Sequence, residues 1–355
     1  MALSDIDRMQ EAISLGNVKF AKEEMERRRQ APVHVSGAEA SAYRESKGGL
    51  GIVHLIDPKL GFNVRSIRLW VNYAGIGEEG WEGWVNLGHR HLIDAVICIL
   101  QGHGYSIIDG VRYDWGPGDF MCVPTFAWHR HVNLGDEPVA YVAGTSTPYS
   151  QSIGVSIHED ERYPEYWVFA QKSEEARTTL IPGGAEAPSV IPGSQSVSEF
   201  RGDQGLAAYL YEQQVDFAVA EEKRRRLGRV VVRGSDLEFG QTRMGSLAYI
   251  IDSRLGFNTK VMSTVLAEIP SGKRSGAHRH LYEEVNYVLS GEGYSIIDDR
   301  RFDWKAGDAL SIPVFAWHQY FNTGSEPVRI LSHSNRAAME NMGIQVTQQG
   351  EPADY

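Results

Sequence analysis

The chain from His89 to Gly110 reads HRHLIDAVICILQGHGYSIIDG, and it returns as HRHLYEEVNYVLSGEGYSIIDD from His278 to Asp299. The two stretches are offset by 189 positions. The same offset carries further residues of the first copy onto identical partners in the second: Pro124, Trp128, His129 and Asn133 onto Pro313, Trp317, His318 and Asn322. A constant register over this length indicates that the chain contains one domain twice.

Upstream of the histidines the repeat continues with a changed offset. LGFN, which starts at Leu60, recurs 195 positions later, so the first copy holds six extra residues, which we place near Trp81 to Trp84. FAKEEMERRR from Phe20 matches FAVAEEKRRR from Phe217. Alanine, glutamate, methionine and arginine favour helices, so we expect a charged helix before each copy.

Within each copy, short β-rich runs are bounded by turn-forming residues. YSIID from Tyr105 and FMCVP from Phe120 are examples, and many such strands at close spacing predict a jelly-roll barrel. The expected fold is therefore mainly all-β, with two tandem jelly-roll barrels and short flanking helices. The predicted organisation is a helical arm over 1–36, a barrel over 37–160, a Pro- and Gly-rich linker with a helix over 161–230, a second barrel over 231–345 and a tail over 346–355.

The composition restricts the classes of partner. A formal net charge of −11 disfavours nucleic acid, because phosphate binding needs a basic surface, and leaves small molecules as the expected ligands. The two cysteines, Cys98 and Cys122, favour a reducing compartment. Residues 1–30 lack the apolar core of a signal peptide, and no run reaches the roughly 18 apolar residues of a membrane span. We expect a cytoplasmic protein without membrane contact, and sheet edges and duplicated helices favour a homo-oligomer.

Each copy carries histidines at a spacing that chelates a metal ion. Alternate side chains of a strand share a face, so His89 and His91 converge. His129 is expected to supply a third nitrogen from a distant strand, and three imidazoles leave positions open on a divalent ion, as in a catalytic site. In the second copy the matching histidines are joined by a glutamate where the first copy has Ala95: His278, His280, His318 and Glu284.

The alternative interpretation is that these histidines lie on the surface or are hydrogen-bonded core residues, as most single histidines are. Six of the twelve histidines stand at duplicated positions, which favours metal binding in at least one copy. Glu284 follows a second acidic residue, Glu283, so a surface position is the alternative for Glu284.

These residues resemble the cupins, whose first motif is G(X)5HXH(X)3,4E(X)6G and whose second is G(X)5PXG(X)2H(X)3N. The second copy matches the first motif throughout, and the first copy lacks only the glutamate: Gly272, His278, His280, Glu284 and Gly291, against Gly83, His89, His91 and Gly102. The second motif fits both copies, except that Phe126 and Phe315 replace its inner glycine. The resemblance implies two cupin barrels.

Among cupins with two barrels, the first copy is similar to the gentisate and salicylate 1,2-dioxygenases, in which HRH, a GEG-like turn, PGDF and WHxH recur. The matching segments here start at His89, Gly102, Pro117 and Trp128. The resemblance implies Fe(II) held by three residues: His89, His91 and His129.

The same resemblance assigns His131 to the substrate's hydroxyl side as an acid or base. His131 shares strand parity with His129 and should project into the same cavity, where a plain wall residue is the alternative. The family's arginine for the substrate carboxylate, six residues after the second histidine, is replaced by Ile97. Arg68, in the strand region before the insertion, is our candidate for that role.

Three functions remain open. The resemblance favours an Fe(II)-dependent dioxygenase that uses O2 to open the ring of a hydroxylated aromatic acid. The three histidines and one glutamate of the second copy favour another bicupin enzyme, of the oxalate decarboxylase or quercetinase type, with Mn(II) or another divalent metal. The third is a non-enzymatic metal- or ligand-binding bicupin, against which the six retained histidines argue.

Overall fold

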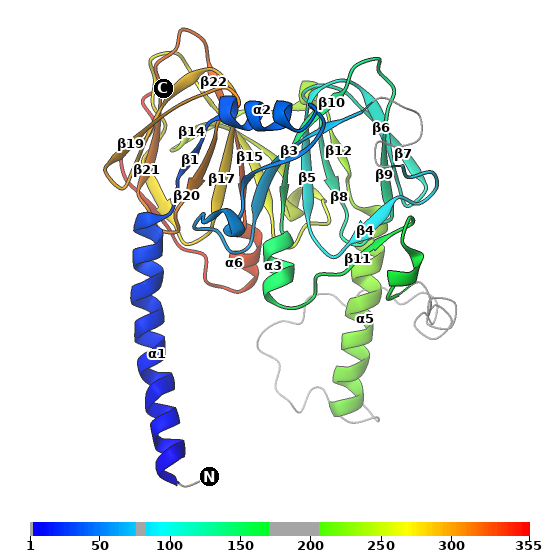
Figure 1. The fold of residues 1–355 in the computed structure, drawn as a ribbon, viewed down its shortest axis with the longest axis vertical. Coiled ribbons are helices and arrows are strands. Elements are labelled where there is room, and N and C mark those ends of the chain that lie inside the picture. Colours follow the sequence, from blue (N-terminus) through cyan, green and yellow to red (C-terminus); the bar gives the residue numbers. More distant parts are fainter. Residues whose placement is uncertain (1–2, 76–82, 170–205) are drawn as a thin grey trace.

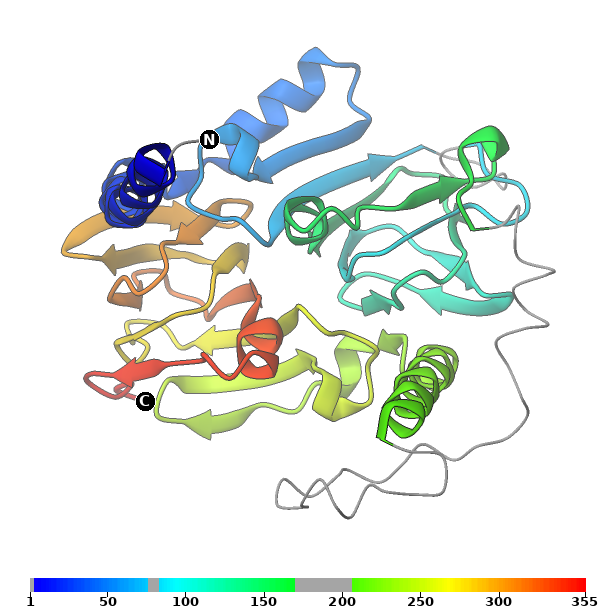
Figure 2. The ribbon, with the colours of Figure 1, turned by 90° about the horizontal axis from the view of Figure 1, so that it is seen from below.

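Two barrels lie side by side, each built from two antiparallel sheets (Figures 1 and 2). The computed structural model describes residues 3–75, 83–169 and 206–355. The mainly all-β fold and the two jelly-roll barrels are confirmed. The predicted insertion near Trp81 lies partly outside the described residues, and the Pro- and Gly-rich part of the linker, 170–205, lies wholly outside them.

The first barrel pairs a six-stranded sheet, in the order β12-β8-β5-β10-β3-β2, with a five-stranded sheet, in the order β11-β4-β9-β6-β7. These strands are β2 (Gly51–Ile56), β3 (Arg68–Ala74), β4 (His89–His91), β5 (Ala95–Gln101), β6 (Gly104–Ile108), β7 (Val111–Trp115), β8 (Phe120–Val123), β9 (His129–Asn133), β10 (Val139–Thr145), β11 (His158–Asp160) and β12 (Val231–Val232).

The second barrel pairs a seven-stranded sheet, in the order β1-β20-β17-β22-β15-β14-β13, with a five-stranded sheet, in the order β19-β18-β21-β16-β23. These strands are β1 (His34–Val35), β13 (Gly240–Thr242), β14 (Gly245–Ile251), β15 (Ser263–Ile269), β16 (His278–His280), β17 (Glu284–Ser290), β18 (Glu292–Ile297), β19 (Arg300–Lys305), β20 (Ala309–Ile312), β21 (His318–Asn322), β22 (Val328–Ser334) and β23 (Thr347–Gln349).

The repeated GYSIID segment ends in a two-residue hairpin turn. In the first barrel Asp109 and Gly110 join β6 to β7 with φ values of 46° and 82°, and positive φ at both positions gives the turn the twist of the flanking strands. Asp109 Oδ1 also accepts a hydrogen bond from the backbone N–H of Trp128 at 3.0 Å. The turn therefore helps to position the start of β9, where His129 stands.

Each barrel is completed by a short strand that precedes the other barrel in the chain. β1 pairs with β20 of the second barrel, and β12 pairs with β8 of the first. An aspartate reinforces each crossing: the buried Asp308 accepts a hydrogen bond from Gly37 N at 2.8 Å, and the partly buried Asp119 accepts one from Gly234 N at 3.0 Å. β12 thus lies within the range predicted for the second barrel, 231–345, but pairs with a strand of the first. The domain boundaries themselves stay a prediction.

One hydrophobic cluster spans both barrels, and two further clusters lie one in each barrel. The spanning cluster joins Leu55, Val71 and Cys98 of the first barrel to Ile250 and Val285 of the second. Burial of apolar side chains from both copies in one cluster stabilises the pair as a unit.

The helices before the two copies project from the same end of the barrels (Figure 1). α1 (Leu3–Gln30) has 28 residues and α5 (Leu206–Leu227) has 22, so both are longer than the short flanking helices we expected. Arg28 of α1 donates to Val314 O at 3.5 Å in the second barrel, and Arg225 of α5 forms a salt bridge with Asp109 of the first. The remaining helices of the described residues are α2 (Gly37–Ser46), α3 (Thr147–Ser152), α6 (Arg336–Asn341) and the 3-10 turns η1 (Pro58–Leu60), η2 (Pro164–Tyr166), η5 (Gly234–Asp236) and η6 (Ser253–Leu255).

Candidate active site

Three histidines of the first barrel meet in space although the chain separates them. β4 carries His89 and His91, and β9 carries His129, which pairs directly with His89 across the sheet. One nitrogen of each ring lies within 4.8 Å of the others. The structure therefore brings together the two histidines of the HxH pair and the third histidine that we expected from a distant strand.

The electrostatics of this trio suit metal binding. Burial lowers the pKa of His129 to about 4, and burial also lowers the pKa of His89 and His91, with a further contribution from the neighbouring rings. All three are then neutral near pH 7, which is the form that binds a metal. His129 Nδ1 lies 2.8 Å from Ala127 O, so the hydrogen bond to this carbonyl leaves Nε2 as the ligand nitrogen.

A buried nitrogen without a partner supports the same conclusion. Within the described residues, His89 Nδ1 has no hydrogen-bond partner. Buried polar atoms rarely lack a partner, so a ring in this state fits a metal-holding role. The donor set, three neutral imidazoles, suits Fe(II), Mn(II) or another divalent metal.

The trio opens into a cavity of about 360 Å³ between the two sheets of the first barrel. This volume lies within the range typical of small-molecule sites. Aliphatic side chains such as Ile93, Ile97 and Val123 line part of the wall. The polar and aromatic part of the wall includes Arg68, Trp84, His131, Tyr141, His158 and Arg162.

His131 lines this cavity on the same face of β9 as His129, as strand parity predicted. Its Nδ1 lies 2.7 Å from Ser106 Oγ, which in turn accepts a hydrogen bond from Trp115 Nε1 at 2.9 Å. Burial, followed by the nearby His129, lowers the pKa of His131 well below its usual value. The ring is therefore neutral and held in one orientation at the cavity wall.

Arg68 reaches the cavity from the first position of β3. Its Nε donates to Thr145 Oγ1 at 3.0 Å, and no salt bridge to it is present in the described parts of the chain. Burial lowers the pKa of Arg68, an effect that Asp57 partly opposes, yet a guanidinium stays charged. Ile97 also lines the cavity, so the family's arginine position faces the site here but carries no charge.

Sequence reasoning missed a strand that completes the cavity wall. β11 pairs with β4 and places His158 opposite His91, with ring centroids 5.1 Å apart between His158 and His89. Asp160 on the same strand accepts hydrogen bonds from Arg162 and from Trp84 Nε1 at 3.2 Å. The repeat gave no signal for these residues, because the register of 189 places His158 opposite Thr347.

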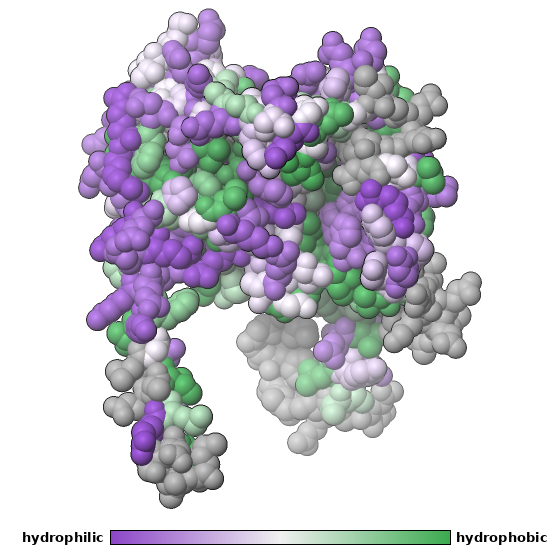
Figure 3. Space-filling view, in the orientation of Figure 1, coloured by the Kyte–Doolittle hydropathy of each residue, from purple (hydrophilic) through white to green (hydrophobic). Residues whose placement is uncertain are grey.

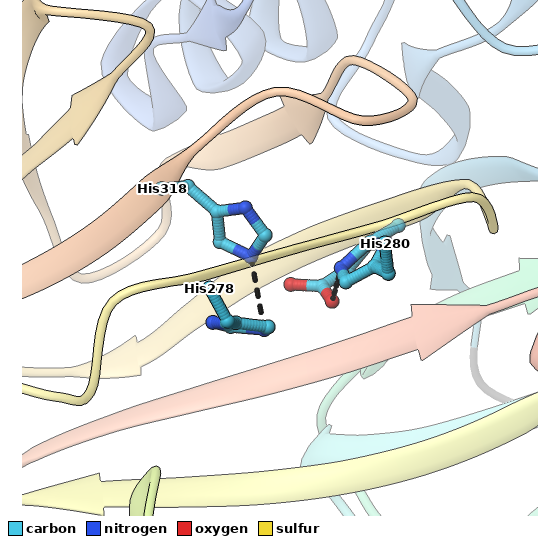
Figure 4. A group of neighbouring side chains, drawn as sticks. His278, His280 and His318 are labelled. Atoms are coloured by element: carbon cyan, nitrogen blue, oxygen red, sulfur yellow. Dashed lines mark hydrogen bonds and ion pairs between the residues drawn. The ribbon is translucent and has the colours of Figure 1, made fainter. Parts of the chain in front are cut away.

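The second barrel assembles all four of its predicted ligands, three of which Figure 4 labels. His278 and His318 face each other with Nε2 atoms 3.1 Å apart, and His280 Nε2 lies 3.1 Å from Glu284 Oε2. His318 Nδ1 lies 3.0 Å from Ala316 O, which repeats the arrangement at His129. The four ligand atoms lie within 4.8 Å of one another, as a metal site requires.

Glu284 is buried rather than on the surface, the alternative considered for it. Burial raises its pKa, but the hydrogen bond to His280 and the neighbouring histidine rings outweigh burial and lower it overall. Asn286 Nδ2 and Tyr320 Oη donate to its Oε1 at 3.0 and 3.1 Å. Tyr282 stacks on the His280 ring at 3.6 Å. The second site is therefore crowded by polar and aromatic side chains where the first has Ala95 and Ile93.

No helix in the described part of the chain is long and apolar enough to cross a membrane.

Comparison with known proteins agrees with the two-barrel fold. A cupin-domain family model matches residues 78–144 and 265–334. A 1-hydroxy-2-naphthoate 1,2-dioxygenase from Nocardioides sp. is 24% identical over 74% of this chain and 62% of its own length. A gentisate 1,2-dioxygenase from Aquipseudomonas alcaligenes is 25% identical over 77% of this chain and 72% of its own. The chain thus spans less than two-thirds of the first of these relatives.

Among solved structures, a salicylate 1,2-dioxygenase from Pseudaminobacter salicylatoxidans superposes with a TM-score of 0.60 at 15% identity. The match covers 90% of this chain and 88% of that one, and at this identity it shows the fold alone. Two matches to the cupin model, two barrels and two sets of candidate ligands agree, so this chain has a two-cupin fold and is similar in sequence to the gentisate and 1-hydroxy-2-naphthoate 1,2-dioxygenases.

Proposed function

We propose that the protein is an Fe(II)-dependent dioxygenase that opens the ring of a hydroxylated aromatic acid, and that the first barrel is its catalytic barrel. One observation carries the proposal: the three histidines of the first barrel open into a cavity of about 360 Å³ that is also lined by Arg68, a partly buried, charged arginine. A cavity of this kind combines a metal, an apolar wall for a ring and a cation for an acid group.

His89, His91 and His129 would hold the metal. An iron ion held by three histidines supplies adjacent positions for the substrate's oxygen atoms and for O2, and a path for electrons between them. The protein contributes neutral ligands on rigid strands, so the ligand geometry is fixed before substrate binds.

Arg68 is proposed as the carboxylate anchor. Its guanidinium lines the cavity and has no salt bridge within the described residues, so a substrate carboxylate can pair with it. A charge-assisted bond of this kind is stronger in a partly buried site than in water. The apolar wall formed by Ile93, Ile97 and Val123 would contact the ring.

His131 is proposed to exchange a proton with the substrate hydroxyl. Its pKa is lowered by burial, so the neutral ring is available at neutral pH. Ser106 holds the ring through Nδ1 at 2.7 Å. General acid–base catalysis needs such an oriented, titratable group within reach of the reacting oxygen.

A second candidate function rests on the second barrel. Its three histidines and Glu284, with Tyr320 hydrogen-bonded to that carboxylate at 3.1 Å, form a complete four-ligand set. This set favours a bicupin enzyme of the oxalate decarboxylase or quercetinase type, with Mn(II) or another divalent metal. The crowding of the second site by Tyr282 and Asn286 favours the first barrel as the place of ring cleavage.

The proposal includes self-association through α1. Six apolar side chains along this projecting helix are exposed: Ile6, Met9, Ile13, Val18, Phe20 and Met25. Figure 3 shows patches of apolar surface on the same helix. Exposed apolar rows of this kind are typical of interfaces, and we propose a second copy as the partner. The two unpaired, buried cysteines support a cytoplasmic location.

Oxygen consumption tests the proposed reaction. The protein would be loaded with Fe(II) without air and mixed with gentisate, salicylate or 1-hydroxy-2-naphthoate in an oxygen electrode. A ring-cleaving dioxygenase consumes O2 in equal amount to the acid, and the aromatic ultraviolet band is lost. Turnover of oxalate without loss of any aromatic acid would favour the second candidate function instead.

A further inference from the structure

A buried carboxylate of the second barrel reaches into the first. Glu283 precedes the ligand Glu284, but its side chain leaves the second barrel and accepts hydrogen bonds from the segment that leads into β3. Its two oxygens accept from Arg65 N at 2.7 Å, from Ser66 N at 2.9 Å and from Ser66 Oγ at 2.6 Å. Only 7% of Glu283 is exposed, so these bonds are shielded from water.

Further contacts fix the same segment. Asn335 Nδ2 donates to Ser66 Oγ at 2.7 Å, and Asn335 Oδ1 accepts from Glu283 N at 2.7 Å. Ser66 O accepts from Tyr149 N at 3.2 Å. Ser66 is therefore held by side chains and backbone from three different segments, and Glu283 accepts two of these four hydrogen bonds.

Arg68 follows this segment directly. The residues that Glu283 holds end two positions before Arg68, the first residue of β3 and the proposed carboxylate anchor. The one hydrogen bond made by the Arg68 side chain goes to Thr145 within the described residues. The place of its guanidinium in the cavity thus depends on where the backbone at 65–67 lies. A displacement of about 1 Å is enough to weaken a directional contact with a ligand.

The repeat provides a matched control. In the opposite direction, Asp94 Oδ2 of the first barrel accepts hydrogen bonds from the backbone of 260–262, at 2.9, 2.7 and 3.0 Å, and from Thr259 Oγ1 at 2.7 Å. This segment leads into β15, whose first residue is Ser263, at the position of Arg68. The contact of Asp94 with the second barrel therefore has the same chemistry as that of Glu283 with the first, but no arginine follows the segment that Asp94 holds.

We propose that Glu283 is a positioning residue for the first barrel's site, through which the second barrel holds Arg68 where a substrate carboxylate binds. The inference rests on the proposed role of Arg68. It gives the second barrel a part in the reaction that needs no chemistry at its own metal ligands.

The binding of two related ligands tests whether Glu283 positions Arg68, and it requires no catalytic turnover. Gentisate carries the carboxylate, whereas hydroquinone is the same ring without it. Affinities would be measured by calorimetry on Zn(II)-loaded protein in the absence of oxygen. The variants are Glu283→Gln, the milder Ser66→Ala, the conservative Glu283→Asp, the control Thr259→Val, and Arg68→Gln as the reference for a lost anchor.

Glu283→Gln should lower the affinity for gentisate about tenfold, and Ser66→Ala should lower it about threefold. The affinity for hydroquinone should stay unchanged in both variants. Glu283→Asp should recover most of the affinity, because Asp94 makes the same kind of contact with a shorter side chain. Thr259→Val, which removes the matching hydroxyl from Asp94, should affect neither ligand.

Three results would contradict the positioning role of Glu283. In the first, Glu283→Gln loses as much affinity for hydroquinone as for gentisate, and in the second it keeps full affinity for gentisate. In the third, Thr259→Val loses as much gentisate affinity as Glu283→Gln. Full gentisate affinity in Arg68→Gln would contradict both the role of Arg68 as the carboxylate anchor and the positioning role of Glu283. If the affinities follow the prediction but the Fe(II)-loaded protein consumes no O2, ring cleavage is wrong as the function, whereas the positioning of Arg68 by Glu283 is supported.

Discussion

Two phenylalanines stand where the cupin motif has a glycine, and the backbone explains both. Phe126 and Phe315 have φ values of 63° and 64°, in the left-handed region that glycine adopts without strain. Each ring is covered by an arginine from the HRH strand: Arg90 at 4.1 Å and Arg279 at 4.2 Å. The motif's backbone is thus kept, and cation–π contacts offset part of the strain near the ligand histidines.

His131 gives the most direct residue-scale test of proton transfer. Replacing it in a His131→Asn variant should lower kcat about a hundredfold, because the amide cannot take up or release a proton at neutral pH. Metal content should not change, since His131 is not among the proposed ligands. Steady-state kinetics and metal analysis provide the measurement. Tyr320→Phe at the matching position of the second barrel is the control, and an equal loss of kcat there would contradict the assignment.

Sequence predicted the ligand histidines, which repeat, and missed two cavity residues that neither repeat nor belong to a motif. Strand parity and the register of 189 were enough to group His89, His91 and His129. His158 and Arg162 line the same cavity, but they come from β11 and the turn after it, which carry no repeated residues. Their place depends on long-range pairing of β11 with β4, which local sequence does not encode.

At the scale of elements, buried carboxylates hold the turns that join the strands. Asp252 caps η6, where its Oδ1 accepts from Arg254 N at 3.0 Å and Arg254 Nε at 2.8 Å, and Arg336 of α6 forms a salt bridge with its Oδ2. Burial raises its pKa, but the two arginines outweigh burial and lower the pKa of Asp252 from 3.8 to about 2. The carboxylate therefore stabilises the fold only while it is charged.

The sign of this pKa shift predicts a pH dependence. A lowered pKa contributes stability above the unfolded value of 3.8, and the contribution is lost as pH falls toward about 2. Asp252→Asn should thus be less stable than the parent at pH 7, by about 2 kcal/mol, with the difference shrinking between about pH 4 and pH 2. Urea unfolding at several pH values measures this. The exposed Asp303→Asn is the control, and a difference that is constant down to pH 2 would refute the account.

The elements themselves were predictable to different degrees. The hairpin between β6 and β7 follows from the run that ends in Asp109-Gly110, because these residue types accept positive φ. β1 and β12 have two residues each, too few to show the alternation that marks a strand. Their exchange between barrels is a consequence of tertiary packing and therefore appeared only in the structure.

At the scale of the whole molecule, metal binding should contribute to stability. The two ligand sets lie in barrels that are joined by a common hydrophobic cluster, so an ion bound at either set stabilises the common folded unit. Removal of divalent metals with a chelator should lower Tm by about 5 °C, and re-addition should restore it. Differential scanning calorimetry measures the change. A His129→Ala, His318→Ala double variant should lose this dependence on chelator, whereas an unchanged Tm of the parent would show that neither set holds a metal.

The most direct test of the first barrel as the site of ring cleavage compares His129→Ala with His318→Ala. Both variants would be loaded with Fe(II) without air, and O2 uptake with gentisate, salicylate and 1-hydroxy-2-naphthoate would be recorded beside the parent. We predict that His129→Ala loses uptake, because it removes a ligand at the open cavity, while His318→Ala keeps most of it. Loss of uptake in His318→Ala with full uptake in His129→Ala, or no uptake by the iron-loaded parent, would contradict the account.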